Sequence, residues 1–292
     1  MEDLVQLVVS GTAAGAIYAL AAVGFTLLWQ ASGTINFAQG EFVMLPAFAM
    51  LFFLNVAGLP LPIAFLAACA VSTLVLGWGF RRVVVEPLIR HGVIPLVIAT
   101  LGLSVGLKQL VKAGVGAEAH PFPSLFPDTE VTLAGIAVST ADIGTLLLAG
   151  AIVAGLQAFL QRTVTGRAMQ AVAQNREAAR VVGIDVRRMI LYTFLINACF
   201  AAVAALLVTP AYLAKFDMGD TIGLKAFFAA IIGGFNQSRG ALLGGVLIGV
   251  TENIVGFYVS PAYKEGVALM LFLGVILFRP EGLLGRREER KV

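Results

Sequence analysis

Amide and charged side chains interrupt the apolar stretches of this 292-residue chain. Near the N-terminus, Asn36, Gln39 and Glu41 follow one another beside Gly33 and Gly40. A carboxylate among apolar residues is costly unless it faces a polar cavity or has an internal partner. These side chains could line a path for a polar solute, or they could hydrogen-bond backbone groups that are freed where a helix is interrupted.

The second half of the chain contains a similar interruption. Asn236 and Gln237 lie between Gly233-Gly234 and Gly240. Each interruption is glycine-rich and is followed by an apolar stretch. This pattern suggests broken helices in corresponding positions of a duplicated transporter fold, and we treat internal symmetry as a hypothesis.

Three further polar residues lie within apolar stretches. Lys225 and Glu252 are charged residues near opposite ends of their segments, and Lys225 either extends to the membrane surface or lines the path. Asn197 is expected to make a hydrogen bond between helices. The candidates for a translocation path are Asn36, Gln39, Glu41, Lys225, Asn236, Gln237 and Glu252.

Composition places these residues in a membrane protein. Of all residues, 59% are hydrophobic and 13% are charged, and the charged share is about half that of a soluble domain. One water-soluble core cannot bury so much apolar surface. The net charge of +3 does not point to nucleic acid. Cys69 and Cys199 lie in apolar stretches without metal-ligand spacing and are expected to be packing residues.

Segments of about 20 mostly apolar residues predict the membrane-spanning helices. They fall near residues 4–28, 35–54, 61–80, 93–113, 142–161, 189–212, 221–235, 241–258 and 262–278. The expected fold is an all-α polytopic bundle of about eight or nine spans, forming a single transmembrane domain over residues 1–292. Segments 35–54 and 221–235 are expected to be broken or re-entrant. The acidic start lacks the basic residues of a cleavable signal peptide, so the first span is expected to be retained.

The basic residues predict the orientation, because Lys and Arg are retained on the cytoplasmic side. With nine alternating spans and the N-terminus outside, 15 of the 20 basic residues fall on the cytoplasmic face. We therefore expect a periplasmic N-terminus, a cytoplasmic C-terminus and an irregular periplasmic loop at about 114–141, which contains three prolines.

The polar connection at 162–188 is the clearest functional signal. Residues 166–182 are rich in helix formers and contain no proline, and Gly183 is suited to end a helix. The sequence predicts one short cytoplasmic helix at about 166–183. Such a helix could dock into a groove on a partner protein or lie on lipid headgroups through its arginines.

Four stretches resemble permeases of ATP-driven importers. Glu177-Ala178-Ala179, three residues and then Gly183 resemble the coupling loop of ABC importer permeases. Residues 18–45, residues 225–252 and the segment Arg-Pro-Glu-Gly-Leu-Leu-Gly at 279–285 resemble the branched-chain amino acid permease family. The resemblance implies coupling to an ATPase through Arg176, Glu177, Ala178, Ala179 and Gly183.

The same resemblance implies the partners. They are a second homologous permease that forms a heterodimer with this chain, two ATP-binding cassette subunits that bind ATP and Mg²⁺, and a periplasmic substrate-binding protein. The expected location of this chain is the bacterial inner membrane. This chain itself is expected to carry no cofactor, metal or catalytic residue. It has no Gly-x-x-x-x-Gly-Lys-Ser/Thr phosphate loop, and His91 and His120 are isolated.

The implied function is import of branched-chain amino acids or of related small polar or carboxylate substrates by alternating access. Two other readings stay open. The chain could be a stand-alone secondary transporter or channel that uses Glu41, Glu252 and Lys225 as a proton or ion relay, or it could be a noncatalytic membrane scaffold.

Overall fold

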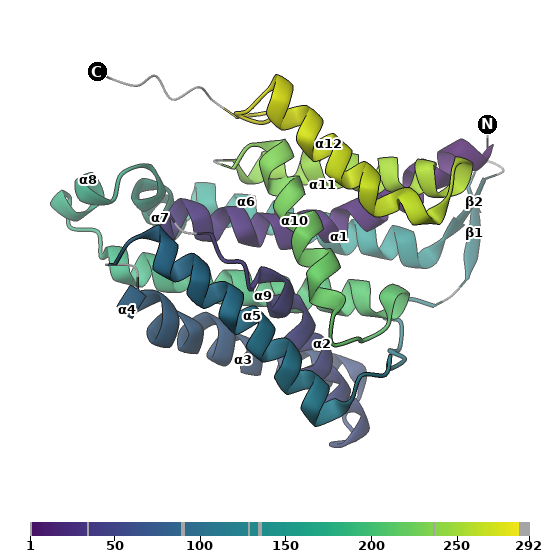
Figure 1. Ribbon diagram of the computed structural model, residues 1–292, viewed down its shortest axis with the longest axis horizontal. Coiled ribbons are helices and arrows are strands. Elements are labelled where there is room, and N and C mark those ends of the chain that lie inside the picture. Colours follow the sequence, from purple (N-terminus) through teal and green to yellow (C-terminus); the bar gives the residue numbers. More distant parts are fainter. Residues whose placement is uncertain are drawn as a thin grey trace. The chain divides into compact units, whose positions relative to one another are not determined.

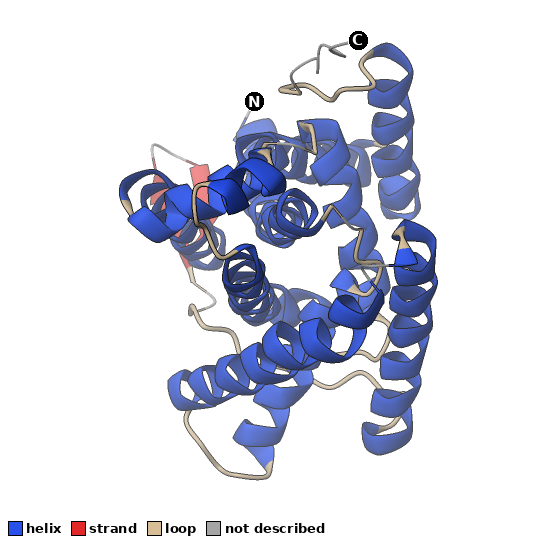
Figure 2. Ribbon diagram, turned by 90° about the vertical axis from the view of Figure 1, so that its left-hand side faces the viewer, coloured by secondary structure: helices blue, strands red, loops and turns tan. Residues whose placement is uncertain are grey.

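The computed structural model describes residues 2–33, 35–88, 91–127, 129–133, 136–235 and 237–285. Within these ranges nearly all of the regular structure is helical, as Figure 2 shows. The helices are α1 (Glu2–Ser32), α2 (Gln39–Asn55), α3 (Leu61–Ser72), α4 (Glu86–Leu88), α5 (Val93–Val115), α6 (Thr140–Arg162), α7 (Val164–Gln174), α8 (Arg176–Val181), α9 (Val186–Tyr212), α10 (Met218–Gly233), α11 (Ser238–Tyr258) and α12 (Lys264–Phe278). Two π-helical segments, Thr73–Gly79 and Arg81–Val85, continue α3 to α4, and a 3₁₀ turn at Pro261–Tyr263 precedes α12.

The predicted all-α polytopic fold is confirmed. Seven helical segments of the described chain are long and apolar enough to cross a membrane, and α2 is a shorter apolar helix. Each of the nine expected segments coincides with a helix. The two that were expected to be short are α2, with 17 residues, and α10, with 16 residues.

The chain forms two compact units. Unit 1 contains residues 1–26, 126–149 and 225–292, and unit 2 contains residues 27–125 and 150–224. Within unit 2, α2 packs against α3, α5 and α9, and these helices run alongside one another in Figure 1. Phe80 contributes to this core through ring contacts with Phe42 and Phe194 at 5.2 and 5.9 Å.

Glycines bring helix backbones together within unit 1. A Cβ atom at Gly15 would lie 2.6 Å from the carbonyl oxygen of Gly245, and Gly249 lies against Gly11 in the same way. Small residues allow such an approach between helices in lipid, where van der Waals contact replaces the hydrophobic driving force. The Gly-x-x-x-Gly spacing at 11–15 and 245–249 therefore packs α1 on α11 inside one chain.

The loop expected at 114–141 contains a feature that the sequence analysis missed. In unit 1, β1 (Glu130–Leu133) and β2 (Ile136–Ser139) pair as an antiparallel hairpin. Alternating β-branched residues such as Val131 and Val138 carry the strand signal. The preceding irregular part belongs to unit 2, where the backbone of His120 exchanges two hydrogen bonds of 3.0 Å with Ala214.

Adding a methyl group should destabilise the protein only at glycines that are packed against another backbone. Gly245→Ala should destabilise the detergent-purified protein by about 1–3 kcal/mol, because a new Cβ would overlap the backbone of Gly15. Gly102→Ala is the matched control, since nothing lies within 4 Å of a Cβ there. Thermal unfolding followed by size exclusion measures both variants; equal midpoints would contradict the packing role.

Candidate functional site

The connection between α6 and α9 folds as an arm of two helices, α7 and α8. The prediction of one continuous helix over 166–183 is wrong, because Asn175 adopts an extended backbone (φ −157°, ψ 109°) between them. Its side-chain oxygen accepts hydrogen bonds of 3.0 Å from the backbone N–H groups of Glu177 and Ala178. Asn competes with helical hydrogen bonding in this way and starts new helices, a local effect that helix propensity alone misses.

The predicted helix end at Gly183 is confirmed. Gly183 has φ +83°, and its N–H group donates to the Arg180 carbonyl at 3.0 Å. The Ile184 N–H group donates to the Ala179 carbonyl at 2.9 Å. These two bonds form the Schellman arrangement, which needs the left-handed conformation that glycine adopts without strain.

The apolar face of the arm is covered by α9. Val172 of α7 and Ala179 of α8 are buried with Val186 of α9, and Met189 and Ile190 pack against them. This contact uses the side chains that would otherwise enter a lipid surface. The outward residues of α8 and its end are both polar and apolar, and they are Glu177, Ala178, Arg180, Val181 and Val182.

Arg176 connects the arm to the end of α1 within unit 2. A Cβ atom at Gly33 would lie 3.2 Å from Nη2 of Arg176. Gly33 has φ +62° and directly follows α1, which has no basic residue in its last turn. Half-burial and the neighbouring Arg180 charge lower the pKa of the Arg176 guanidinium. A cation is favourable at a helix C-terminus because the last carbonyl groups point there.

The first predicted interruption is a real break between α1 and α2. The side-chain oxygen of Asn36 accepts a 3.1 Å hydrogen bond from the Ala38 N–H group. The amides of Gln39 and Asn197 exchange two hydrogen bonds of 2.9 and 3.1 Å, and both side chains are buried. The prediction that Asn197 bonds between helices is confirmed, and its partner is the path candidate Gln39.

Glu41 lies in the first turn of α2 and is 1% exposed. Ser104 of α5 hydrogen-bonds its carboxylate, and Lys108 and Asp220 act on it electrostatically. Lys108 Nζ lies 2.8 Å from Asp220 Oδ1. Among the described residues, neither Glu41 Oε1 nor the Asn36 side-chain nitrogen has a hydrogen-bond partner. The break thus contains a buried acceptor and a buried donor that are free for a water molecule or a solute.

The second break lies in unit 1, between α10 and α11. Asn236 lies outside the described residues, and the Gln237 N–H group donates to the Gly234 carbonyl at 3.0 Å. The C-terminal segment caps this break. The N–H groups of Leu283 and Leu284 donate to the carbonyls of Ile232 and Gly233 at 2.8 and 3.2 Å.

Lys225 and Glu252 are partners within unit 1. Lys225 Nζ lies 2.9 Å from Glu252 Oε2, and both residues are almost fully buried, so Lys225 does not extend to the membrane surface. The Tyr18 hydroxyl lies 3.2 Å from both groups and donates to the carboxylate. These three side chains form a buried cluster that joins α1, α10 and α11. Tyr18 was not among the residues predicted from the sequence.

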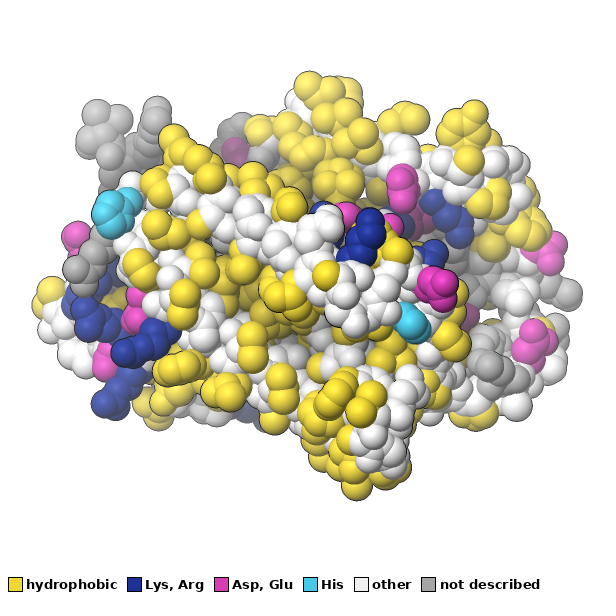
Figure 3. Space-filling model, turned by 60° about the horizontal axis from the view of Figure 1, so that its bottom comes forward, with side chains coloured by type: hydrophobic (Ala, Val, Ile, Leu, Met, Phe, Trp, Pro, Cys, Tyr) yellow, Lys and Arg dark blue, Asp and Glu magenta, His cyan; other side chains and the backbone are white. Residues whose placement is uncertain are grey.

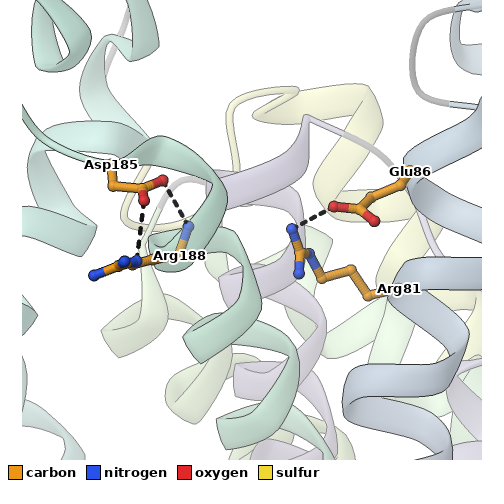
Figure 4. Close-up of polar contacts among 4 residues, drawn as sticks. All are labelled: Arg81, Glu86, Asp185 and Arg188. Carbon is orange, nitrogen blue, oxygen red and sulfur yellow. Dashed lines mark hydrogen bonds and ion pairs between the residues drawn. The ribbon is translucent and has the colours of Figure 1, made fainter.

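Ion pairs and arginines gather at one end of unit 2. Figure 4 shows Arg81 paired with Glu86, and Arg188 paired with Asp185 at the start of α9. In Figure 3, Lys and Arg side chains cluster at the end where α4, α7 and α8 lie in Figure 1. Lys108 and Lys112 lie further along the chain, towards the opposite, C-terminal end of α5. Within the described part of the chain, no cluster of His, Cys, Asp or Glu could hold a metal ion.

Membrane-length helices, two polar breaks and an exposed helical arm are typical of a membrane transport permease. The chain belongs to the family described as "Branched-chain amino acid transport system / permease component", which matches residues 7–276.

Individual relatives agree over nearly the full length. The chain is 36% identical to the high-affinity branched-chain amino acid transport system permease protein BraD of Pseudomonas aeruginosa, covering 98% of this chain and 97% of that protein. It is 32% identical to the permease protein LivH of Escherichia coli over the same shares. A probable LivH of Methanocaldococcus jannaschii is 28% identical over 91% of this chain and 88% of that protein.

One solved structure, PsaBC from Streptococcus pneumoniae in complex with Fab, is 14% identical with a TM-score of 0.49, over 95% of this chain and 91% of that chain. The family assignment rests on the sequence relatives alone.

The buried cluster of Tyr18, Lys225 and Glu252 predicts that stability losses in single variants will not add in the double variant. Glu252→Gln and Lys225→Met should each destabilise the protein by about 3–5 kcal/mol, because each leaves one buried charge unpaired. The double variant should lose much less than the sum. A double-mutant cycle on denaturation in detergent measures the coupling, and additive losses would contradict the pairing.

Proposed function

We propose that this chain is the membrane-spanning permease subunit of an ATP-driven importer for branched-chain amino acids or chemically related small polar or carboxylate solutes. The main support is the 32–36% identity, over 98% of the chain, to permeases whose names state branched-chain amino acid transport. Substrate would cross by alternating access, and ATP would be bound and hydrolysed with Mg²⁺ by partner subunits rather than by this chain.

The α7–α8 arm is the proposed contact with an ATPase subunit. Its apolar face is already occupied by α9, so its remaining surface is available for a partner. Val181 and Val182 are 87% and 74% exposed beside the charged Glu177 and Arg180. An exposed ridge of this mixed character suits a groove on another protein better than lipid headgroups, because its largest apolar side chains are few and next to charges.

Arg176 would transmit a movement of the arm to the membrane-spanning segment. Its guanidinium lies against Gly33, at the start of the first break, which also contains Asn36 and Gln39. Movement of α8 would shift the cation that stabilises the carboxyl end of α1. The break would then change shape together with the Gln39–Asn197 amide pair, which joins it to α9.

The basic end of unit 2 supports a cytoplasmic arm with a periplasmic N-terminus, following the retention of Lys and Arg on the cytoplasmic side. The proposed complex contains a second homologous permease, two ATPase subunits and a periplasmic binding protein. Specificity would depend largely on the binding protein.

A stand-alone secondary transporter is the second candidate. It would need Lys225 and Glu252 as relay groups, but these residues bind each other and Tyr18 in a buried cluster. That pairing favours a structural role for both residues. Uptake that follows a proton gradient and persists without an ATPase would favour the secondary transporter.

Changes in the arm should separate transport from folding. Glu177→Arg and Gly183→Pro should abolish ATP-dependent uptake of labelled leucine, while the protein still inserts into the membrane. The first reverses a charge on the exposed face, and the second cannot adopt φ +83°. Gln109→Ala, exposed on α5 and outside the arm, is the matched control. Normal uptake by both arm variants would remove the basis of the proposal.

Arg176 should affect coupling more than assembly. Arg176→Ala should still co-purify with the ATPase subunits, yet transport per ATP hydrolysed should fall about fivefold, because about 1 kcal/mol of helix-end stabilisation is lost. Arg176→Lys keeps the cation and should recover part of the activity. If Arg176→Ala transports as well as Gln109→Ala, the proposed route through Gly33 is wrong.

A further inference from the structure

An apolar groove runs along the outside of unit 2, independently of the breaks and the arm. Its volume is about 620 Å³. One wall is formed by α3 and its π-helical continuation, and the other by Leu195 of α9. Leu66, Leu74 and Trp78 on the first wall are 65%, 62% and 46% exposed.

The dimensions of the groove fit a lipid chain. Leu66 and Trp78 are twelve positions apart, which corresponds to about 18 Å along a helix. One leaflet of the hydrocarbon core is about 15 Å deep. The length and the apolar lining of the groove therefore suit an extended acyl chain.

One end of the groove carries a cation. The guanidinium carbon of Arg82 lies 5.7 Å from the ring centroid of Trp78. The neighbouring Arg81 points inward instead, with its side chain 11% exposed and paired with Glu86 at 2.6 Å. Arg82 is exposed and has no carboxylate among its described ion pairs. A stacked guanidinium with free donors matches a phosphate group.

We propose that this groove binds one acyl chain of an anionic phospholipid, whose phosphate group is held by Arg82 beside Trp78. The apolar walls would take the chain, and the arginine would select negatively charged headgroups over zwitterionic ones. A basic site next to a membrane span attracts anionic lipid in this way. The site does not depend on the proposed transport mechanism.

Tryptophan fluorescence can test the site in the full chain. The protein has two tryptophans, Trp29 and Trp78, so Trp29→Phe leaves Trp78 as the reporter. The protein is reconstituted in vesicles of phosphatidylglycerol and phosphatidylcholine in equal amounts, with brominated chains on one lipid at a time. Brominated phosphatidylglycerol should occupy the site about fivefold more often than brominated phosphatidylcholine.

Arg82→Gln should equalise the two lipids, whereas Arg187→Gln, which changes another exposed arginine, should keep the preference. Equal quenching in the parent, or a preference that survives Arg82→Gln, would overturn the proposal. Absence of quenching by either lipid would also overturn it, since Trp78 would then be covered by protein. If Trp29→Phe does not fold, the signal lost between the wild type and Trp78→Phe reports the same quantity.

Discussion

Backbone hydrogen bonding in lipid limits how the helices of this chain can be interrupted. No water is available in the hydrocarbon core, so every N–H and carbonyl group released by an interrupted helix needs an internal partner. Among the described membrane segments, such interruptions follow Ser32 and Gly233. Each interruption begins with a glycine of positive φ, Gly33 or Gly234, because the chain must turn sharply there.

Different groups lie against the helix ends at the two breaks. Backbone N–H groups of Leu283 and Leu284 cap α10 directly, which ties the second break to a segment of fixed geometry. At the first break, a single long side chain, Arg176, lies against the turn. Because that side chain belongs to the α7–α8 arm, the proposed coupling would act on the first break. This difference makes the first break the better candidate for a moving part.

The polar residues in the spans bind one another more than the lining of a simple path would require. Gln39 binds Asn197, and Lys225 binds Glu252 and Tyr18, each within one unit. In unit 2, Glu41 and Asn36 each retain a buried atom without a hydrogen-bond partner among the described residues, and in unit 1 the same holds for Glu252 Oε1. If a solute meets the wall of unit 2, Glu41 and Asn36 are the candidates that have capacity left to bind it.

Local sequence signals predicted the apolar helical segments, the positions of both breaks, the end of α8 at Gly183 and the family. These depend on the length of apolar stretches, on glycine chemistry and on extended motifs, all of which are local in the chain. Three-dimensional packing was needed to show that Lys225 is buried beside Glu252, that Asn197 meets Gln39 and that the C-terminal segment caps α10. Those partners lie 27 or more positions apart, and side chains so distant can be paired only once helix packing places them side by side. The division of the arm at Asn175 shows the same limit on a small scale: its residues favour one helix, but one side-chain cap starts a second.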